Sequence, residues 1–416
     1  MLHLIVFSHL RWNSACRRPQ HLLSRLAHHF PVLFVEEPVH EAGAARLERA
    51  LPVAGVEVLR PIIPVGTDGF GERQLPLLQP LLADYLLERG IDDYAVWFYT
   101  PMAAPLLDGL SPRAVMYDCI DDLSAFADAR GPAARHEAAL LGIADLVLAA
   151  SPSLFEAKRE LNPHVLCLPS AVEAHRFAPE RAADSIDAML KAEQIQGRIP
   201  GPRLGFFGAI DEQVDTALLA AVADAQPDWQ IVMVGPCANA DAARLPRRRN
   251  IHWLGEQPDA LLPRLVADWD VCLLPYAQNH STGFVSPAKA LEYMAAEKPI
   301  VATAVHDIVA MYGDVVRIGH DTRSFIECCR WALSETADKR AERIGEMLAT
   351  VSRFSWDTTA SSIHEAIDGV LAKRPRHAHH ETAVEPAGGW RGLTPPRTAP
   401  ARPGPARGPT VLANAG

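Results

Sequence analysis

The sequence predicts an α/β protein with two doubly wound domains, each a parallel sheet covered by helices, and a disordered C-terminal tail. Short apolar runs alternate with segments of helical periodicity over most of the chain. This alternation is typical of parallel sheets covered on both faces. The roughly a dozen apolar runs exceed what one ordinary open sheet holds, and a long interval without strand character interrupts them mid-chain. Two domains are therefore expected.

The expected elements follow the chain in order. In the first half, helices are expected at Arg18–His29 and Glu72–Arg89, and strands at residues 3–7, 32–36, 56–60, 94–98, 114–118, 146–150 and 164–168. In the second half, strands are expected at residues 203–208, 230–235, 251–255, 270–275, 299–303 and 315–319.

The domain boundary is expected between Leu168 and Arg203, where Pro, Gly and mixed charges replace the strand pattern. Residues beyond about 373 are rich in Pro, Ala and Arg and hold too few apolar side chains to form a core. We therefore divide the chain into an N-terminal domain, a C-terminal domain, a C-terminal helix and a disordered tail: residues 1–175, 176–355, 356–372 and 373–416.

The composition indicates a cytoplasmic protein without a nucleic-acid partner. The 416 residues are 49% hydrophobic and 22% charged, with a formal net charge of −10, and this acidic balance argues against nucleic-acid binding. The seven cysteines show neither paired nor metal-ligand spacing, which suits reduced thiols. The first residues lack the features of a signal peptide, and no apolar run approaches the ~20 residues that span a bilayer.

A basic and aromatic cluster near the N-terminus leaves two interpretations open. Arg11, Trp12, Arg17 and Arg18 form either an ordinary surface cluster or a contact with anionic lipid or a lipid-diphosphate acceptor. In the second case the protein would make peripheral contact with the inner membrane surface.

Glycines end three expected strands of the second half. Gly208, Gly235 and Gly255, which follows Leu254, stand where an open α/β sheet lets a ligand approach the backbone closely. Each glycine alone could serve only a turn, but three on one sheet favour a ligand cleft. No dinucleotide fingerprint, P-loop or nucleophile elbow occurs in the sequence, so it does not indicate an ordinary NAD or NTPase site.

The segment SPAKALEYMAAEKPIVAT, residues 286–303, carries the sharpest signal. Ser286 is placed as the N-cap and Pro287 as the first residue of a helix, whose free N–H groups and dipole form an anion site. Lys289 lies in the first turn, where a cation is unfavourable unless an anion is near, and this points to a diphosphate. Glu292 lies on nearly the same face and can accept two hydrogen bonds from a ribose diol. From these residues alone, phosphate-ligand binding and a solvated ion pair remain equally supported.

The same segment resembles the donor-site motif of GT-B glycosyltransferases of the retaining family 4, which ends in EAMAxGxPVVA; this chain has LEYMAAEKPIVAT. The opening SHLRWNSACRRPQHLLSRLA resembles a bacterial subgroup whose first turn reads W…QRPQHLL. The segments MYDCIDDLSAF (116–126) and RFSWDTTA (353–360) fit that subgroup too. The resemblance spans about residues 1–370. It implies two Rossmann-like domains facing each other across a cleft, with the C-terminal helix packed back toward the N-terminal domain.

The resemblance also implies roles for individual residues. Glu292 would bind the nucleotide ribose, Ser286 to Lys289 the diphosphate, and the loops after Gly208 and at Leu254 and Gly255 the rest of the donor. The acceptor would lie against the N-terminal domain, with these residues facing the cleft: His9, Arg18, His21, Asp118, Asp121 and Asp122. The candidate catalytic residues are Lys289, Glu292 and Asp118.

Three positions depart from the family pattern. The loop after Gly208 has no basic residue, a gap that Lys289 could fill, and Phe284 stands where the first glutamate of the family's pair is usual. Glu297 replaces a helix-ending glycine, and in a left-handed conformation a non-glycine residue there costs about 1 kcal/mol.

The function that the resemblance implies is transfer of a hexose from a nucleotide-sugar to a glycan or lipid-linked acceptor, in synthesis of a surface polysaccharide or glycoconjugate. Retention of configuration and no cofactor or metal are expected. The DWD sequence at 268–270 mimics a metal-binding DxD, but it lies at a helix-to-strand junction where acids commonly cap. The alternatives are a nucleotide-sugar epimerase on the same scaffold and a non-catalytic nucleotide-sugar-binding protein.

Overall fold

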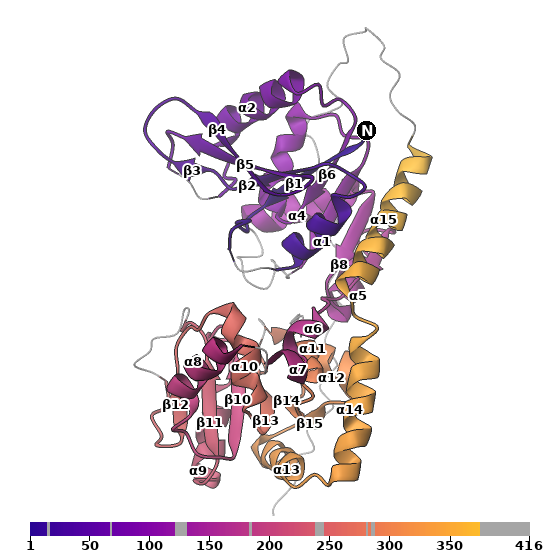
Figure 1. Cartoon of the computed structure of the whole chain (residues 1–416). Coiled ribbons are helices and arrows are strands. Elements are labelled where there is room, and N and C mark those ends of the chain that lie inside the picture. The colour runs from indigo at the N-terminus through magenta and orange to yellow at the C-terminus, as the bar shows by residue number, and fades with distance from the viewer. Residues whose placement is uncertain are drawn as a thin grey trace, which may run out of the picture.

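The computed structural model describes residues 1–14, 17–66, 69–120, 131–182, 185–237, 245–279, 282–283 and 288–374 (Figure 1). The tail expected to be disordered lies outside these residues from position 375 onward. None of the helices in the described ranges combines the length and apolar character needed to cross a bilayer.

The first sheet has the strand order β3-β5-β2-β1-β6-β7-β8-β9, and β4 pairs with β5. All described pairings are parallel except that of β4. Both faces of the sheet are buried, because Val6 and Phe34 pack in one core and Phe7 and Leu33 in the other. The strands are β1 (His3–Ser8), β2 (Val32–Glu36), β3 (Val39–His40), β4 (Arg46–Val53), β5 (Val56–Ile63), β6 (Tyr94–Phe98), β7 (Val115–Cys119), β8 (Leu146–Ala149) and β9 (Val165–Cys167).

The second sheet has the order β12-β11-β10-β13-β14-β15. Its described pairings are all parallel. The strands are β10 (Arg203–Phe207), β11 (Gln230–Val234), β12 (Ile251–Trp253), β13 (Val271–Leu274), β14 (Ile300–Thr303) and β15 (Arg317–Gly319). Two parallel sheets, each with strands that alternate with helices, confirm the predicted fold class.

Helices cover both sheets, and Figure 1 shows α14 beside the second sheet and α15 alongside the first. The helices of the first part are α1 (Arg18–Leu26), α2 (Leu75–Glu88), the 3₁₀ helix η1 (Pro101–Gly109), α4 (Pro132–Ile143), α5 (Pro152–Lys158), α6 (Ala174–Phe177), α7 (Pro179–Ala182) and α8 (Ile186–Gln196). The others are α9 (Thr216–Ala225), the 3₁₀ helix η3 (Asp259–Leu261), α10 (Leu262–Ala267), α11 (Ala288–Ala295), α12 (His306–Tyr312), α13 (Thr322–Leu333), α14 (Ala337–Val351) and α15 (Trp356–Lys373).

Every expected strand is present, with ends that differ by up to three residues. Strand β4 was not expected from the sequence. It pairs antiparallel with β5 across a turn at Gly55, whose φ of 78° is left-handed. Most of its side chains are exposed, so it lacks the alternation of buried and exposed residues by which a strand is recognised.

The last helix returns the chain to the first sheet. Trp356 and Ile363 of α15 are buried in the same core as Leu22 of α1. Arg25 Nε lies 2.6 Å from the Asp357 carboxylate. Since α14 packs on α11 of the second sheet, the consecutive helices α14 and α15 join the two halves of the molecule.

Candidate active site

A cavity of about 320 Å³ lies between the two halves, within the size range of small-molecule sites. The loop after β1 and the start of α1 form one wall, and α6, η3 and α11 form the other. Residues that line it include His9, Arg18 and His21 on the first wall and Arg176, Asp259 and Glu292 on the second.

The strand-end glycines lie together at one edge of the second sheet. Gly208 and Gly235 have φ values of 142° and 145°, a region that residues with a side chain rarely adopt. A Cβ on Gly235 would lie 2.7 Å from the carbonyl carbon of Gly208, so this crossing requires glycine. Gly235 N in turn donates to Gly255 O at 2.8 Å. Leu254 N donates to Met233 O at 2.9 Å, which extends the ladder by one residue.

Lys289 lies directly over this edge. A Cβ on Gly208 would lie 2.9 Å from Lys289 Nζ and closer still to its Cε, so the glycine leaves the room that the lysine occupies. Its Nζ lies 5.8 Å from the centre of the Phe206 ring. The loop after Gly208 carries no basic residue, and Lys289 supplies a cation at this loop instead.

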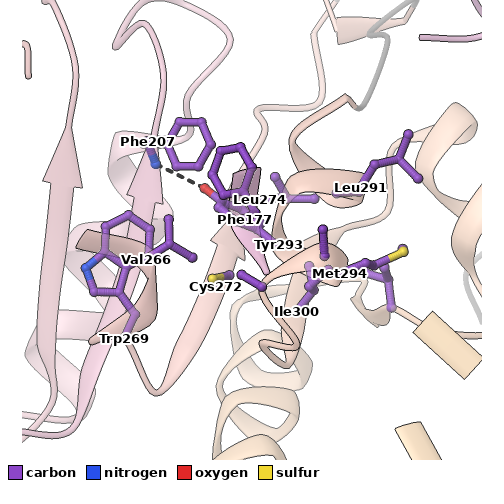
Figure 2. Packing of buried hydrophobic residues seen from close by; sticks show 14 of the residues in the cluster. Phe177, Phe207, Val266, Trp269, Cys272, Leu274, Leu291, Tyr293, Met294 and Ile300 are labelled. Atoms are coloured by element: carbon purple, nitrogen blue, oxygen red, sulfur yellow. Dashed lines mark hydrogen bonds between the residues drawn. The ribbon is translucent and has the colours of Figure 1, made fainter. Parts of the chain in front are cut away.

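The C-terminal part of α11 is held by specific contacts. Phe207 N donates to the Tyr293 hydroxyl at 3.0 Å, and the two rings meet edge to face at 5.2 Å (Figure 2). At the C-terminus, Glu297 N donates to Met294 O at 3.0 Å and Lys298 N to Tyr293 O at 3.1 Å. These two bonds form the Schellman pattern. Glu297 has a left-handed φ of 59°, the conformation in which the sequence analysis expects a non-glycine residue to be unfavourable.

Glu292 lines the cavity, and its carboxylate has no partner among the residues that the structure describes. It makes no hydrogen bond or ion pair with any described residue, including Lys289 three residues before it. Burial raises the pKa of Glu292 to about 7, opposed by the charges of Lys289 and Arg176 and reinforced by Asp259. The ion pair between Lys289 and Glu292 that the sequence allowed is thus not formed. Ser286 and Pro287, expected to start the helix, lie outside the described residues.

Arg18 and Asp118 form a buried pair behind the first wall. Arg18 Nε lies 3.0 Å from Asp118 Oδ2, and Arg18 Nη1 donates to Leu168 O at 2.8 Å. Asp118 has no exposed surface. Burial raises its pKa, and the charge of Arg18 opposes this shift.

Asp118 was expected to face the cleft as a candidate catalytic group, and its position corrects this. Since its carboxylate is fully covered, it holds Arg18 in place and does not reach the cavity. Asp121 and Asp122 lie outside the described residues.

The two histidines of the first wall line the cavity as expected. The His21 ring stacks on Trp356 at 4.8 Å with an angle of 11° between the planes. His21 Nδ1 lies 3.5 Å from Glu173. Burial lowers the pKa of His21, and the Glu173 carboxylate opposes this shift, so the shift favours the neutral imidazole.

Two residues of the second wall were not predicted. Arg176 of α6 and Asp259 of η3 form an ion pair at 2.5 Å beside Glu292. Arg176 belongs to the interval between the sheets that lacks strand character, and neither residue lies in a motif. Their proximity depends on packing between segments far apart in the chain, so no sequence signal identifies them.

The DWD residues have ordinary structural contacts. Asp270 Oδ2 accepts from Arg203 N at 2.7 Å, and Asp268 pairs with Arg264 at 3.1 Å. Both lie at the start of β13, away from the carboxyl edge of the sheet. Among the described residues, no group of three or more His, Cys, Asp or Glu side chains is arranged to hold a metal ion.

Comparison with known proteins defines the class. Residues 201–335 match the family model of the glycosyl transferases group 1. TuaH of Bacillus subtilis (strain 168), assigned to teichuronic acid biosynthesis as a glycosyltransferase, is 28% identical over 296 residues, 66% of this chain and 72% of TuaH.

Solved structures share the fold. Sucrose-phosphate synthase from Thermosynechococcus elongatus aligns with a TM-score of 0.68 and 15% identity over 90% of this chain and 100% of that one. Anabaena HepE in complex with UDP aligns with a TM-score of 0.63 and 16% identity over 89% of this chain and 100% of that one. The Escherichia coli trehalose-6-phosphate structure bound with UDP-2-fluoro glucose aligns with a TM-score of 0.64 and 14% identity over 89% of this chain and 99% of that one.

The paired parallel sheets therefore have the GT-B arrangement. Over residues 201–335, which hold most of the second sheet, the chain matches the group 1 glycosyltransferases.

Proposed function

We propose that the protein transfers a hexose from a nucleotide-sugar to a glycan or lipid-linked acceptor, with retention of configuration and without a metal ion. The observation that carries the proposal is the pair Lys289 and Glu292. They stand at the carboxyl edge of the second sheet, and neither is neutralised by the other. Burying an acid without a partner opposes folding, so a ligand that hydrogen-bonds to Glu292 accounts for its retention.

The donor is assigned to the second wall. Lys289 above Gly208 offers a cation to the diphosphate, and the crossing of Gly208 and Gly235 lets phosphate oxygens approach the backbone. Glu292 would accept hydrogen bonds from the ribose hydroxyls. The charge on the diphosphate grows as the bond to the sugar breaks, so a fixed cation there stabilises the transition state more than the bound substrate.

The acceptor is assigned to the first wall, which is built from His9, Arg18 and His21. A surface polysaccharide or glycoconjugate as product is supported by the relative TuaH, which is assigned to teichuronic acid biosynthesis. UDP is the first nucleotide to test, because two of the similar structures hold UDP or a UDP-sugar. Metal independence is expected from the family resemblance, and activity should therefore survive EDTA.

Two substitutions test the donor assignment. Lys289→Ala should slow transfer by about 10²-fold, the loss typical of one transition-state contact. Glu292→Gln should raise KM for the donor more than it lowers kcat, because the ribose contact is similar in ground and transition states. The measurement is steady-state kinetics of sugar transfer, or of donor hydrolysis where the acceptor is unknown.

Lys339→Ala, which removes an exposed lysine from α14, is the matched control and should leave both constants unchanged. Wild-type kinetics in Lys289→Ala and Glu292→Gln would reject the site. Formation of an epimer of the donor sugar without an acceptor would identify an epimerase instead.

A further inference from the structure

One buried nitrogen in the first wall has no hydrogen-bond partner in the described ranges. Arg18 is 6% exposed and lines the cavity. Its Nε is engaged by Asp118 and its Nη1 by the carbonyl of Leu168. Its Nη2 has no hydrogen-bond acceptor among the described residues. A buried donor left unsatisfied destabilises a fold by about 1–3 kcal/mol, so this nitrogen indicates a missing acceptor.

The surroundings of Arg18 favour an anion. Arg17, directly before it, is exposed, lines the same cavity and forms no ion pair with any described residue. Both arginines stand at the start of α1, a nine-residue helix whose first turn contains no acidic residue. The positive end of the helix dipole therefore adds to their charge.

The carboxylates that line the cavity do not cancel this charge at the first wall. Glu173 lies 3.9 Å from the Arg25 guanidinium, and Asp259 is paired with Arg176 at 2.5 Å. Asp118 neutralises Arg18 from behind, which leaves Arg17 and the helix start as the source of positive potential.

We propose that the start of α1 is a second anion subsite, which binds a phosphate group of the acceptor. This inference rests on the proposed function and adds a substrate class to it. The donor diphosphate has its own cation, Lys289, which does not line this cavity. The Arg17–Arg18 subsite is thus available to the other substrate.

The geometry favours phosphate over carboxylate. A carboxylate is bound best by one guanidinium edge that offers two parallel N–H groups. At Arg18, Asp118 accepts from Nε and the Leu168 carbonyl accepts from Nη1, so the edge formed by Nε is already occupied. What remains is Nη2 of Arg18, the side chain of Arg17 and the helix start. A phosphate presents several acceptor oxygens on a tetrahedral centre and can meet such donors.

The test is calorimetric titration of inorganic pyrophosphate, without divalent metal, into protein saturated with UDP. UDP occupies the donor site, so pyrophosphate should still bind. Arg17→Gln, at an exposed position that folding does not need, should weaken this binding by about tenfold, the loss of one charge-assisted contact. Arg18→Lys, which keeps the charge near Asp118 but removes Nη2, should weaken it as well. Lys339→Ala, at an exposed position on α14, is the control and should leave it unchanged.

Further titrations identify the source of the phosphate. Farnesyl diphosphate binding more tightly than glucose 6-phosphate indicates a lipid-linked acceptor, and the reverse indicates a sugar phosphate. Glucuronate binding in preference to all phosphates would overturn the choice of phosphate.

Three results would overturn the subsite itself: no pyrophosphate binding, binding that UDP abolishes, or binding that is insensitive to Arg17→Gln. If UDP does not bind at all, the donor assignment fails separately. Pyrophosphate is then titrated into the free protein. Binding that is weakened by Arg17→Gln but not by Lys289→Ala supports the subsite, and the opposite result overturns it.

Discussion

Glu292→Gln should make the free protein more stable at alkaline pH while it weakens binding at the proposed donor site. The pKa of Glu292 is raised from an ordinary 4.5 to about 7, chiefly by burial. Between these two values the folded chain holds a proton that the unfolded chain has lost. Wild-type stability therefore falls as pH rises through this window, and no further loss from this group is expected above it. Gln cannot titrate, so the variant lacks this loss.

The magnitude follows from the size of the pKa rise. A change from 4.5 to about 7 corresponds to at most about 3 kcal/mol. The side chain keeps part of its surface in the cavity, and water there weakens the effect, so we expect about 1–2 kcal/mol. For a domain of this size, that is a shift in Tm of about 4 °C in favour of the variant at pH 8 relative to pH 5.

The assay is thermal unfolding of wild type and variant at pH 5 and pH 8, with and without UDP. Glu365→Gln, which removes an exposed carboxylate from α15, controls for the change in net charge. Without ligand, the Tm of Glu292→Gln relative to that of wild type should rise from pH 5 to pH 8. With UDP, wild type should gain more Tm than the variant does. Parallel pH curves for all three proteins would refute the unpaired-acid interpretation.

Three further substitutions test how the site is held. Gly208→Ala places a Cβ against Lys289, so it should reduce transfer at least tenfold with a smaller effect on Tm; an equal loss from Gly90→Ala, at a remote turn, would contradict this. Glu297→Gly relieves the left-handed φ of 59° and should stabilise the protein by about 0.5–1 kcal/mol, measured as a rise in Tm with kcat unchanged. Asp307→Ala removes a buried carboxylate that accepts from Ser153 N at 3.0 Å and thereby joins α12 to α5. It should lower stability by about 1–2 kcal/mol, and unfolding that is unaffected would show that this contact is dispensable.

The fold was largely predictable from the sequence because strand alternation with helices is a local signal. Each buried parallel strand is a short apolar run, and each run is readable without knowledge of its neighbours. Strand β4 shows the limit, since an edge strand with exposed side chains carries no such pattern. Glu297 shows that one position can be informative. It stands where the family has a helix-ending glycine, which suggested a left-handed backbone there, and its φ is left-handed.

The arrangement of the candidate site was predictable only on the side where one short segment carries its residues. Lys289 and Glu292 share a helix, and Gly208 ends a neighbouring strand, so strand order alone brings them to one edge. The opposite wall depends on pairings over long separations. Asp118 ends a strand, but its orientation is decided by Arg18, which is 100 residues away in sequence. Position at a strand end therefore does not tell whether a carboxylate faces a cleft or a buried guanidinium.

Within the described part of the chain, each wall of the cavity leaves one polar group without a hydrogen-bond partner. These groups are the Glu292 carboxylate on the second wall and Arg18 Nη2 on the first. Each arrangement reduces the stability of the free protein, and neither is needed to connect the sheets, which α14 and α15 already join. One ligand that reached both walls would supply partners to both groups at once, whereas two substrates would each supply a partner to one group. Additive Tm gains from UDP and pyrophosphate would therefore indicate two substrates, each stabilising its own wall.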